Sequence, residues 1–263
     1  MEDWGDRNPD GKLPVDLSVP QLSVVVPAYN EEERLPRTLA RLHEYYSGQG
    51  YTYEVIVVSD GSSDGTAELV REFSAQHPQF RVVDYRPNRG KGYAVRTGIE
   101  EATGELILFC DADLATPQEE TEKLLDHMRQ GADVAFGSRP LRDSKLEIHQ
   151  PFYREMLGRF FNKLVQLMAV RGIEDTQCGF KMFTSKAAHE IFRRCTLDGF
   201  SFDFEALMIG RDLGYRMDEV PIRWAHQEGS KVVLLRDGPR MLRDLFKLRM
   251  GGKRKRLAPR QNS

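Results

Sequence analysis

The sequence predicts an α/β fold in which a mainly parallel sheet is flanked by helices. Short apolar runs alternate regularly with segments of helical periodicity, which is the pattern of successive strand–helix–strand units. Turns rich in aspartate and glycine follow the apolar runs. Ligands of open sheets of this kind bind outside the carboxyl ends of the strands, so these turns are candidate binding loops.

Each expected element is predicted from its own pattern of apolar residues. A short apolar run indicates a buried strand, and apolar residues three or four positions apart indicate a helix. All of the elements fit in one domain, because 263 residues can bury one large core. The expected strands are Leu22–Val26, Glu54–Ser59, Arg81–Arg86, Glu105–Cys110 and Asp133–Ser138. The expected helices are Glu31–Tyr46, Asp64–Ala75, Lys91–Ala102 and Pro117–Arg129.

Two later segments, Phe152–Val170 and Pro239–Met250, are expected to form amphipathic helices. The first can cover the sheet or lie at an interface, and its pattern does not decide between them. A basic cluster directly follows the second, which favours contact with a membrane surface over packing on the sheet. We therefore expect a disordered leader at 1–20, a main domain at 21–235, and a basic amphipathic helix and tail at 236–263.

The net charge of −2 conceals an uneven distribution of charged residues. The segment from Arg236 to Arg260 holds ten basic and two acidic residues, so it carries +8 while the rest of the chain carries −10. This asymmetry indicates an anionic partner, either a membrane surface or a nucleic acid, or else a solvated tail. Nucleic acid is disfavoured, since the basic residues are not interleaved with aromatic residues as on a stacking surface.

Any membrane contact is expected to be peripheral. No signal peptide is visible, and no uninterrupted apolar run reaches the roughly 18 residues that a spanning helix needs. The three cysteines, Cys110, Cys178 and Cys195, show neither metal-ligand spacing nor a disulfide framework, which fits a reducing compartment. We therefore expect the protein on the cytoplasmic face of a membrane.

Two carboxylates stand at the end of one expected strand. Asp111 and Asp113 follow the apolar run Leu106–Cys110, and carboxylates two residues apart can converge on one Mg²⁺ or Mn²⁺ ion. An ion that bridges a diphosphate would neutralise the negative charge that develops on the diphosphate when its bond to another group breaks. The alternative is a solvated loop, because Asp-X-Asp alone is a weak motif.

Two other turns carry residues that suit a nucleotide. Asp60 can accept a hydrogen bond from a base, whereas Asp64 in the same turn is a candidate helix cap. Lys91 lies between two glycines at a helix start, which suits an anionic ligand. Because these turns follow successive strands, Asp60, Lys91 and Asp113 can face one cleft.

The turn after the first strand has two explanations. Asn30 is a candidate N-cap, and Glu31 and Glu32 would then lie in the first helical turn, where the helix dipole favours acids. Capping does not explain Pro27 and Tyr29, which could wall the pocket of a base in the same cleft.

These motifs resemble family 2 of the inverting glycosyltransferases, which have the GT-A fold. The resemblance is carried by VPAYNEE, VSDGSSDGT, RGKGYAVRTG and DAD in this order, and it extends from about Leu22 to Arg249. The stretch Gly172–Phe183 is similar to the dolichyl-phosphate glucosyltransferase branch, as are Phe202–Glu205 and Trp224 to Lys231. Polyprenyl-phosphate mannosyltransferases share much of this pattern.

The resemblance implies roles for matching residues. Arg139 and Arg154 would hold a lipid phosphate, and Lys231 would assist the diphosphate or the acceptor unless it is solvated. Asp175 and Gln177 would belong to an acceptor loop. A serine and a glutamine of the family pattern are replaced here by Gly158 and Ala115. The nucleoside would contact Pro27, Tyr29, Glu31, Asp60 and Lys91, with Asp111 near the ribose and Asp111 and Asp113 at the metal.

The expected reaction is an inverting transfer of a hexose, with UDP-glucose the favoured donor and a polyprenyl phosphate the acceptor. Alternatives are GDP-mannose as donor, a sugar or protein hydroxyl as acceptor, or a non-catalytic nucleotide-sugar binding module. With a hydroxyl acceptor Asp203 would be the candidate general base. With a phosphate acceptor, Asp203 and Glu205 would instead orient the sugar or anchor the loop Gln177–Lys181. Trp224 could stack on a sugar, although packing in the core is its default.

Overall fold

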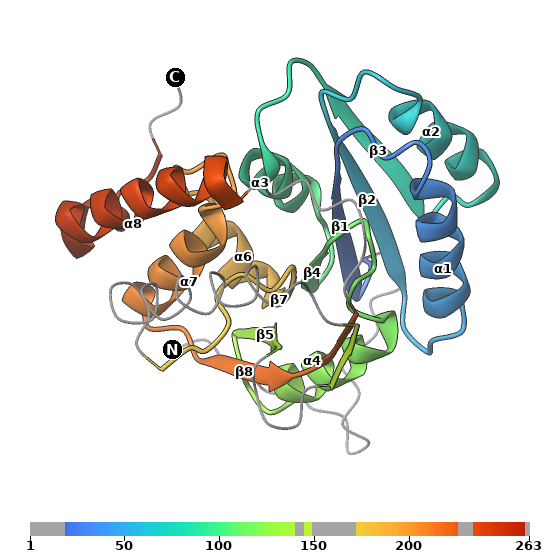
Figure 1. The fold of residues 1–263 in the computed structure, drawn as a ribbon. Helices are drawn as coiled ribbons and strands as arrows, with labels where there is room; N and C mark the ends of the chain where they lie inside the picture. The colour runs from blue at the N-terminus through green and yellow to red at the C-terminus, as the bar shows by residue number, and fades with distance from the viewer. Residues whose placement is uncertain (1–18, 140–144, 149–171, 226–233, 261–263) are drawn as a thin grey trace.

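A seven-stranded sheet forms the centre of the fold (Figure 1). The computed structural model describes residues 19–139, 145–148, 172–225 and 234–260. The strand order is β3-β2-β1-β4-β7-β5-β8, and the chain therefore builds the sheet outward in both directions from β1. The strands are β1 (Leu22–Ala28), β2 (Tyr53–Asp60), β3 (Phe80–Tyr85), β4 (Leu106–Cys110), β5 (Val134–Ser138), β7 (Phe180–Thr184) and β8 (Met217–Pro221).

The sheet is parallel except for β7, which runs antiparallel to both of its neighbours. The five predicted strands are all present, within two residues at either end. The prediction of a mainly parallel α/β sheet is therefore confirmed. The insertion of β7 between β4 and β5 was not predicted, and it brings the segment after Gly172 to the centre of the sheet.

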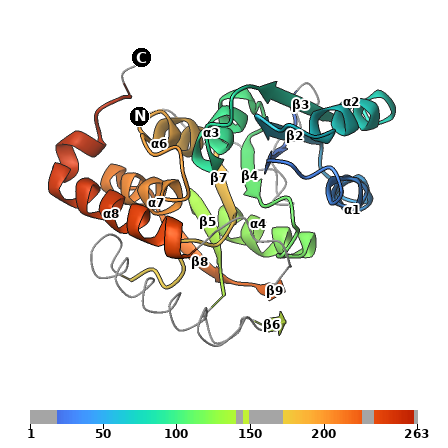
Figure 2. The same cartoon turned by 45° about the horizontal axis from the view of Figure 1, so that its top comes forward.

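Helices cover both faces of the sheet (Figures 1 and 2). Apolar side chains of β1 and β2 alternate between two separate clusters, as expected for strands buried on both faces. One cluster is closed by α1 (Leu35–Ser47), α2 (Thr66–Gln76) and α4 (Thr121–Arg129), which follows the short 3-10 helix η1 (Gln118–Glu120). The other is closed by α3 (Lys91–Glu101), α6 (Ser185–Phe192), α7 (Phe202–Leu213) and α8 (Leu234–Arg256).

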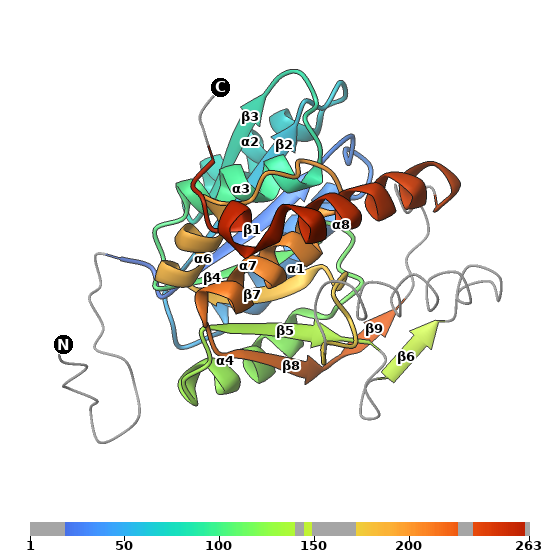
Figure 3. The same ribbon diagram turned by 90° about the vertical axis from the view of Figure 1, so that its left-hand side faces the viewer.

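A second, two-stranded sheet lies beyond the edge strand β8 (Figure 3). It pairs β6 (Lys145–Ile148) with β9 (Arg223–Ala225) in parallel. The amide of Ala225 donates to the carbonyl of Ala115 at 2.9 Å. This bond holds β9 against the loop that follows β4.

Two predicted helix caps differ in the structure. Asn30 is not an N-cap, since α1 begins only at Leu35 and Asn30 has a positive φ of 50°. Its side-chain oxygen instead accepts a hydrogen bond from the Ser63 amide at 2.8 Å. Gly65 occupies the N-cap position of α2, but Asp64 accepts the amide of Thr66 at 3.1 Å and so still satisfies a donor of the first turn.

Helix α8 is packed onto the main domain by its inner face. Met241 and Leu245 are buried in the same apolar cluster as α7. Asp244 accepts a hydrogen bond from the Ser201 hydroxyl at 2.9 Å, and Arg256 pairs with Asp212 at 2.6 Å. Helix α8, for which the charge pattern predicted membrane contact, therefore also packs against α7. Only its outer face is available to another partner.

Some expectations concern residues outside the described ranges. The amphipathic segment Phe152–Val170 and the residues Arg154 and Lys231 are among them. Within the ranges that the structure describes, no helix is both long enough and apolar enough to cross a membrane.

We expect Leu245→Ala to lower the free energy of unfolding by about 2–5 kcal/mol, because it empties a fully buried position between α8 and the core. Phe246→Ala is the matched control on the next residue, whose side chain is 51% exposed. It should change the free energy by less than about 0.5 kcal/mol. Denaturant unfolding followed by circular dichroism measures both. Equal effects would show that α8 is not part of the cooperative core.

Candidate active site

The turns after β1 and β2 are joined to each other by hydrogen bonds. The amide of Asn30 donates to the Ser62 hydroxyl at 3.1 Å, and the amide of Glu31 donates to the Thr66 hydroxyl at 2.9 Å. Tyr29, just before them, is 41% exposed, which is unusual for a large apolar side chain in this protein. The two turns thus form one wall at the carboxyl edge of the sheet, with an accessible aromatic ring.

Asp60 fixes the loop that leads into α3. Its buried carboxylate accepts hydrogen bonds from the Tyr85 hydroxyl at 2.9 Å and the Asn88 side-chain amide at 2.9 Å. It also accepts the backbone amides of Arg89 at 2.7 Å and Gly90 at 2.8 Å. Asp60 is therefore the anchor of this loop, and its contact with a base stays a prediction.

A partly buried cluster of charged side chains lies where α3, β4, β7 and α7 meet. Lys91 pairs with Asp111 at 2.6 Å, and Lys181 pairs with Asp203 at 2.5 Å. Asp113 lies near enough to influence the pKa of Lys91, as Asp203 does. The predicted residues Lys91, Asp111, Asp113 and Asp203 are thus brought together, in a cluster of three carboxylates and two ammonium groups.

Burial and neighbouring charges shift the pKa values of two groups in the cluster. Burial and the adjacent Asp111 carboxylate both raise the pKa of Asp113. Burial alone would lower the pKa of Lys91, but Asp111 and Asp203 outweigh it and the pKa is raised. In the described part of the chain no group of three or more Asp, Glu, His or Cys side chains is arranged to hold a metal ion. The pair Asp111 and Asp113 stays the metal site predicted from the sequence.

Lys181 was not predicted as a site residue. It is a lysine within the apolar strand β7, and its side chain is almost fully buried. Its ammonium group donates to the Cys178 carbonyl as well as to Asp203. A lysine inside an apolar run is rarely buried without a partner, and that signal could have identified it.

Asp203 thus anchors the end of the loop Gln177–Lys181, which is one of the two roles expected for it. Glu205 does not share this role. Its buried carboxylate accepts the amides of Thr196 and Leu197 and so holds the segment between α6 and α7.

Arg139 and Asp175 form a bidentate ion pair at the end of β5. The guanidinium donates to the two carboxylate oxygens at 2.6 and 2.8 Å, and the Arg139 amide donates to the same carboxylate at 3.2 Å. Burial alone would raise the pKa of the fully buried Asp175, but Arg139 outweighs it and the pKa is lowered. The amide of Gln177 also donates to Asp175 at 3.2 Å, so all three predicted residues lie together.

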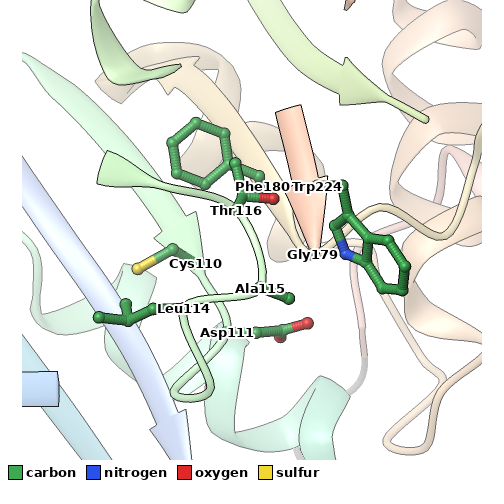
Figure 4. Close-up of a pocket in the computed structure, with 8 residues that line it drawn as sticks. All are labelled: Cys110, Asp111, Leu114, Ala115, Thr116, Gly179, Phe180 and Trp224. Atoms are coloured by element: carbon green, nitrogen blue, oxygen red, sulfur yellow. The ribbon is translucent and has the colours of Figure 1, made fainter. Parts of the chain in front are cut away.

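A small pocket adjoins the charged cluster (Figure 4). A β-carbon added to Gly179 would lie 2.0 Å from the Asp111 carboxylate, so the close approach of β7 to β4 requires glycine there. The guanidinium carbon of Arg139 lies 5.4 Å from the centre of the Trp224 ring at the pocket wall. The lining residues are Cys110, Asp111, Leu114, Ala115, Thr116, Gly179, Phe180 and Trp224.

Comparison with known proteins identifies the class of enzyme. Among solved structures, glucosyl-3-phosphoglycerate synthase from Mycobacterium tuberculosis in complex with UDP superposes with a TM-score of 0.61 and 18% identity, over 92% of this chain and 82% of that chain. The mannosyltransferase PcManGT from Pyrobaculum calidifontis in complex with GDP-Man and Mn²⁺ gives 0.58 and 21%, over 89% and 65%. These likenesses confirm the GT-A fold of glycosyltransferases.

The chain belongs to glycosyl transferase family 2, whose sequence model matches residues 23–192. It is 42% identical to dolichyl-phosphate beta-glucosyltransferase of Drosophila melanogaster over 86% of this chain and 73% of that protein. It is 37% identical to the Homo sapiens protein of the same name, over 89% and 76%. The predictions of a family 2 glycosyltransferase and of its branch are confirmed.

We expect Asp175→Asn to lower the free energy of unfolding at pH 7 by about 3 kcal/mol, because it leaves a buried guanidinium without its counter-charge. Asp175 has a lowered pKa in the folded protein. Its contribution is therefore complete above about pH 4, the unfolded value, and is lost as the pH falls through the folded value. The difference between wild type and variant should shrink accordingly in denaturant titrations at pH 7, 4 and 3.

Asp126→Asn is the control, since Asp126 and Arg129 form an ion pair at the surface of α4. It should cost less than about 1 kcal/mol. A difference between wild type and Asp175→Asn that stays constant with pH would contradict the ionised pair.

Proposed function

We propose that this protein transfers glucose from UDP-glucose to a polyprenyl phosphate of the dolichyl type, with inversion at the anomeric carbon. The relatives at 37–42% identity are named dolichyl-phosphate beta-glucosyltransferases, which supports both the sugar and the acceptor. A related fold has been solved with Mn²⁺ and UDP-glucose, which supports the donor more loosely.

The environment of Asp203 carries the proposal. A hydroxyl acceptor needs a general base, because its proton must leave during the attack. The candidate base is buried, and Lys181 holds it at 2.5 Å. A carboxylate in that position is poorly placed to take a proton from an incoming acceptor. A lipid monophosphate needs no base, since its second pKa is near 6 and it is largely a dianion at neutral pH.

Asp111 and Asp113 would hold a Mg²⁺ or Mn²⁺ ion. Two carboxylates suit these ions, which commonly take their other ligands from water and substrate phosphates. Such an ion would stabilise the departing diphosphate as the sugar leaves.

The chain's own residues then bind and orient the two anions. Lys91 would face the diphosphate, because its partner Asp111 is one of the two candidate metal ligands. Arg139, held in place by Asp175, would orient the acceptor phosphate. Placing two anions next to each other in a buried site is unfavourable unless each is countered, which explains why cations are needed on both sides.

Other predicted residues complete the proposed site. Arg154 would assist Arg139, and Lys231 would contact the diphosphate or the acceptor. Gln177 would help to shape the acceptor loop. The wall of the nucleoside pocket would be formed by Pro27, Tyr29, Glu31 and Asp60.

The outer face of α8 would contact an anionic membrane surface. Phe246 and Met250 are 51% and 86% exposed, and they lie four residues apart on one side of the helix. Exposed basic residues flank them, whereas the two acids of the helix, Asp237 and Asp244, face the protein. The exposed basic residues of this face include Arg240, Arg243 and Lys247.

We place this contact on the cytoplasmic face of the membrane. The three cysteines are all buried and unpaired, which is consistent with a reducing compartment. Apolar side chains flanked by lysine and arginine are typical of helices that lie in the membrane interface.

The function is tested by a donor screen with a short polyprenyl phosphate, in which release of the nucleoside diphosphate and glycosylation of the lipid are both measured. We expect activity with UDP-glucose that depends on Mn²⁺ or Mg²⁺. Asp113→Asn should lower the rate by about 100-fold or more, the scale of losing one electrostatic stabiliser of the transition state. Transfer from GDP-mannose alone, or only to a sugar hydroxyl, would contradict the proposal.

Membrane contact is tested by co-sedimentation with vesicles of phosphatidylcholine, with and without phosphatidylserine. Each basic residue near an anionic surface contributes about 1 kcal/mol, so Arg240→Glu with Lys247→Glu should weaken binding by about tenfold or more. The matched control is Arg37→Glu with Arg129→Glu, two exposed residues of the opposite helical layer. Equal losses in both double variants would show a general charge effect and not a docking face.

A further inference from the structure

We infer that Trp224 is the platform on which the transferred hexose rests, and that its indole makes the site prefer a nucleotide sugar over the bare nucleotide. The inference rests on the proposed function, and it assigns a hexose-binding residue to the pocket beside Asp111. Trp224 is only half-buried and lines that pocket, so its ring is not enclosed in the core.

The backbone on both sides of Trp224 is fixed. Arg223 pairs at 2.6 Å with Glu120, which is only 2% exposed. The amide of Ala225 donates to the Ala115 carbonyl at 2.9 Å. Successive side chains of a strand point to opposite faces, so anchoring the residues before and after Trp224 sets the direction of its indole. The side of β9 from which the indole projects is therefore set before any ligand binds.

The residues across the pocket from Trp224 are small. Ala115 and Gly179 have small side chains or none, and both line the pocket. Figure 4 shows the Asp111 carboxylate pointing toward the side of the pocket where the indole lies. The pocket is thus bounded by a carboxylate, two small residues and one aromatic ring.

The charges around the pocket define which part of the substrate would lie in it. Asp111 and Lys91 mark the proposed diphosphate end, and Arg139, 5.4 Å from the indole centre, marks the proposed acceptor phosphate. The group between a diphosphate and an attacking phosphate is the hexose itself. Aromatic rings bury large apolar area at a polar site, and the C–H face of a hexose is the apolar surface that such a ring can cover.

Tryptophan fluorescence tests this contact directly. The chain contains two tryptophans, Trp4 and Trp224, so a Trp4→Phe variant reports on Trp224 alone. In the presence of Mn²⁺ we expect UDP-glucose to change its emission, and saturating UDP to change it far less. An equal response to UDP and to UDP-glucose would overturn the inference.

Affinity measurements on Trp224 variants provide a second, independent test. Trp224→Ala should raise the dissociation constant of UDP-glucose by about tenfold or more, and that of UDP by less than about twofold. Trp224→Phe should restore most of the affinity, because a ring remains. Equal weakening of UDP and UDP-glucose, or an effect confined to the KM of the lipid phosphate, would overturn the inference.

Failure of the inference is distinguishable from failure of the proposed function. Normal transfer of glucose to the lipid by Trp224→Ala, with unchanged affinity for UDP-glucose, overturns the inference and leaves the function intact. A fluorescence response specific to UDP-glucose supports the inference even if no polyprenyl phosphate accepts the sugar. Should Trp224→Ala fail to fold, the Trp4→Phe titration still decides, because it leaves Trp224 unchanged.

Discussion

The candidate active site at the carboxyl edge of the sheet depends on the balance of charge around Asp111. Its carboxylate is held by Lys91 on one side and is approached by Gly179 on the other, while Asp113 stands two residues further on. Partial burial strengthens these interactions, because charges that are shielded from water are less screened. The carboxylates of the cluster repel one another, and the ammonium groups of Lys91 and Lys181 offset that repulsion.

The loops around this cluster are rigid because each one is tied to the next. Asp60 holds the loop before α3, α3 begins with Lys91, and Lys91 reaches β4. On the other side of β4, Asp203 holds Lys181, and Asp175 holds Arg139. Charged groups that are already in place need little rearrangement when negative charge shifts between two phosphates during a reaction. Glycosyl transfer to a phosphate involves such a shift of charge.

The sequence was most informative where the pattern was local. The five strands that precede Arg139 are short apolar runs, and β2, β3 and β4 lead into turns that contain glycine or aspartate. Their order along the chain already placed Asp60, Lys91 and Asp113 at one edge. The later half carries weaker signals. Strand β7 is apolar but contains a lysine, and α7 is buried along most of its length, so neither has the alternation of a half-exposed element. The anchoring role of Asp60 could be recognised only from three-dimensional contacts.

The antiparallel strand β7 has a consequence for how the protein is made. β4 and β5 precede it by many residues in the chain, yet in the finished sheet they are neighbours only through β7. Until β7 has been synthesised, both strands present unpaired edges, and such edges readily pair with the wrong partner. Completion of the sheet is thus a late step in biogenesis, and it coincides with the arrival of Gly179 and Lys181 beside Asp111. An incomplete nascent chain therefore cannot assemble the charged cluster, however well its first strands have folded.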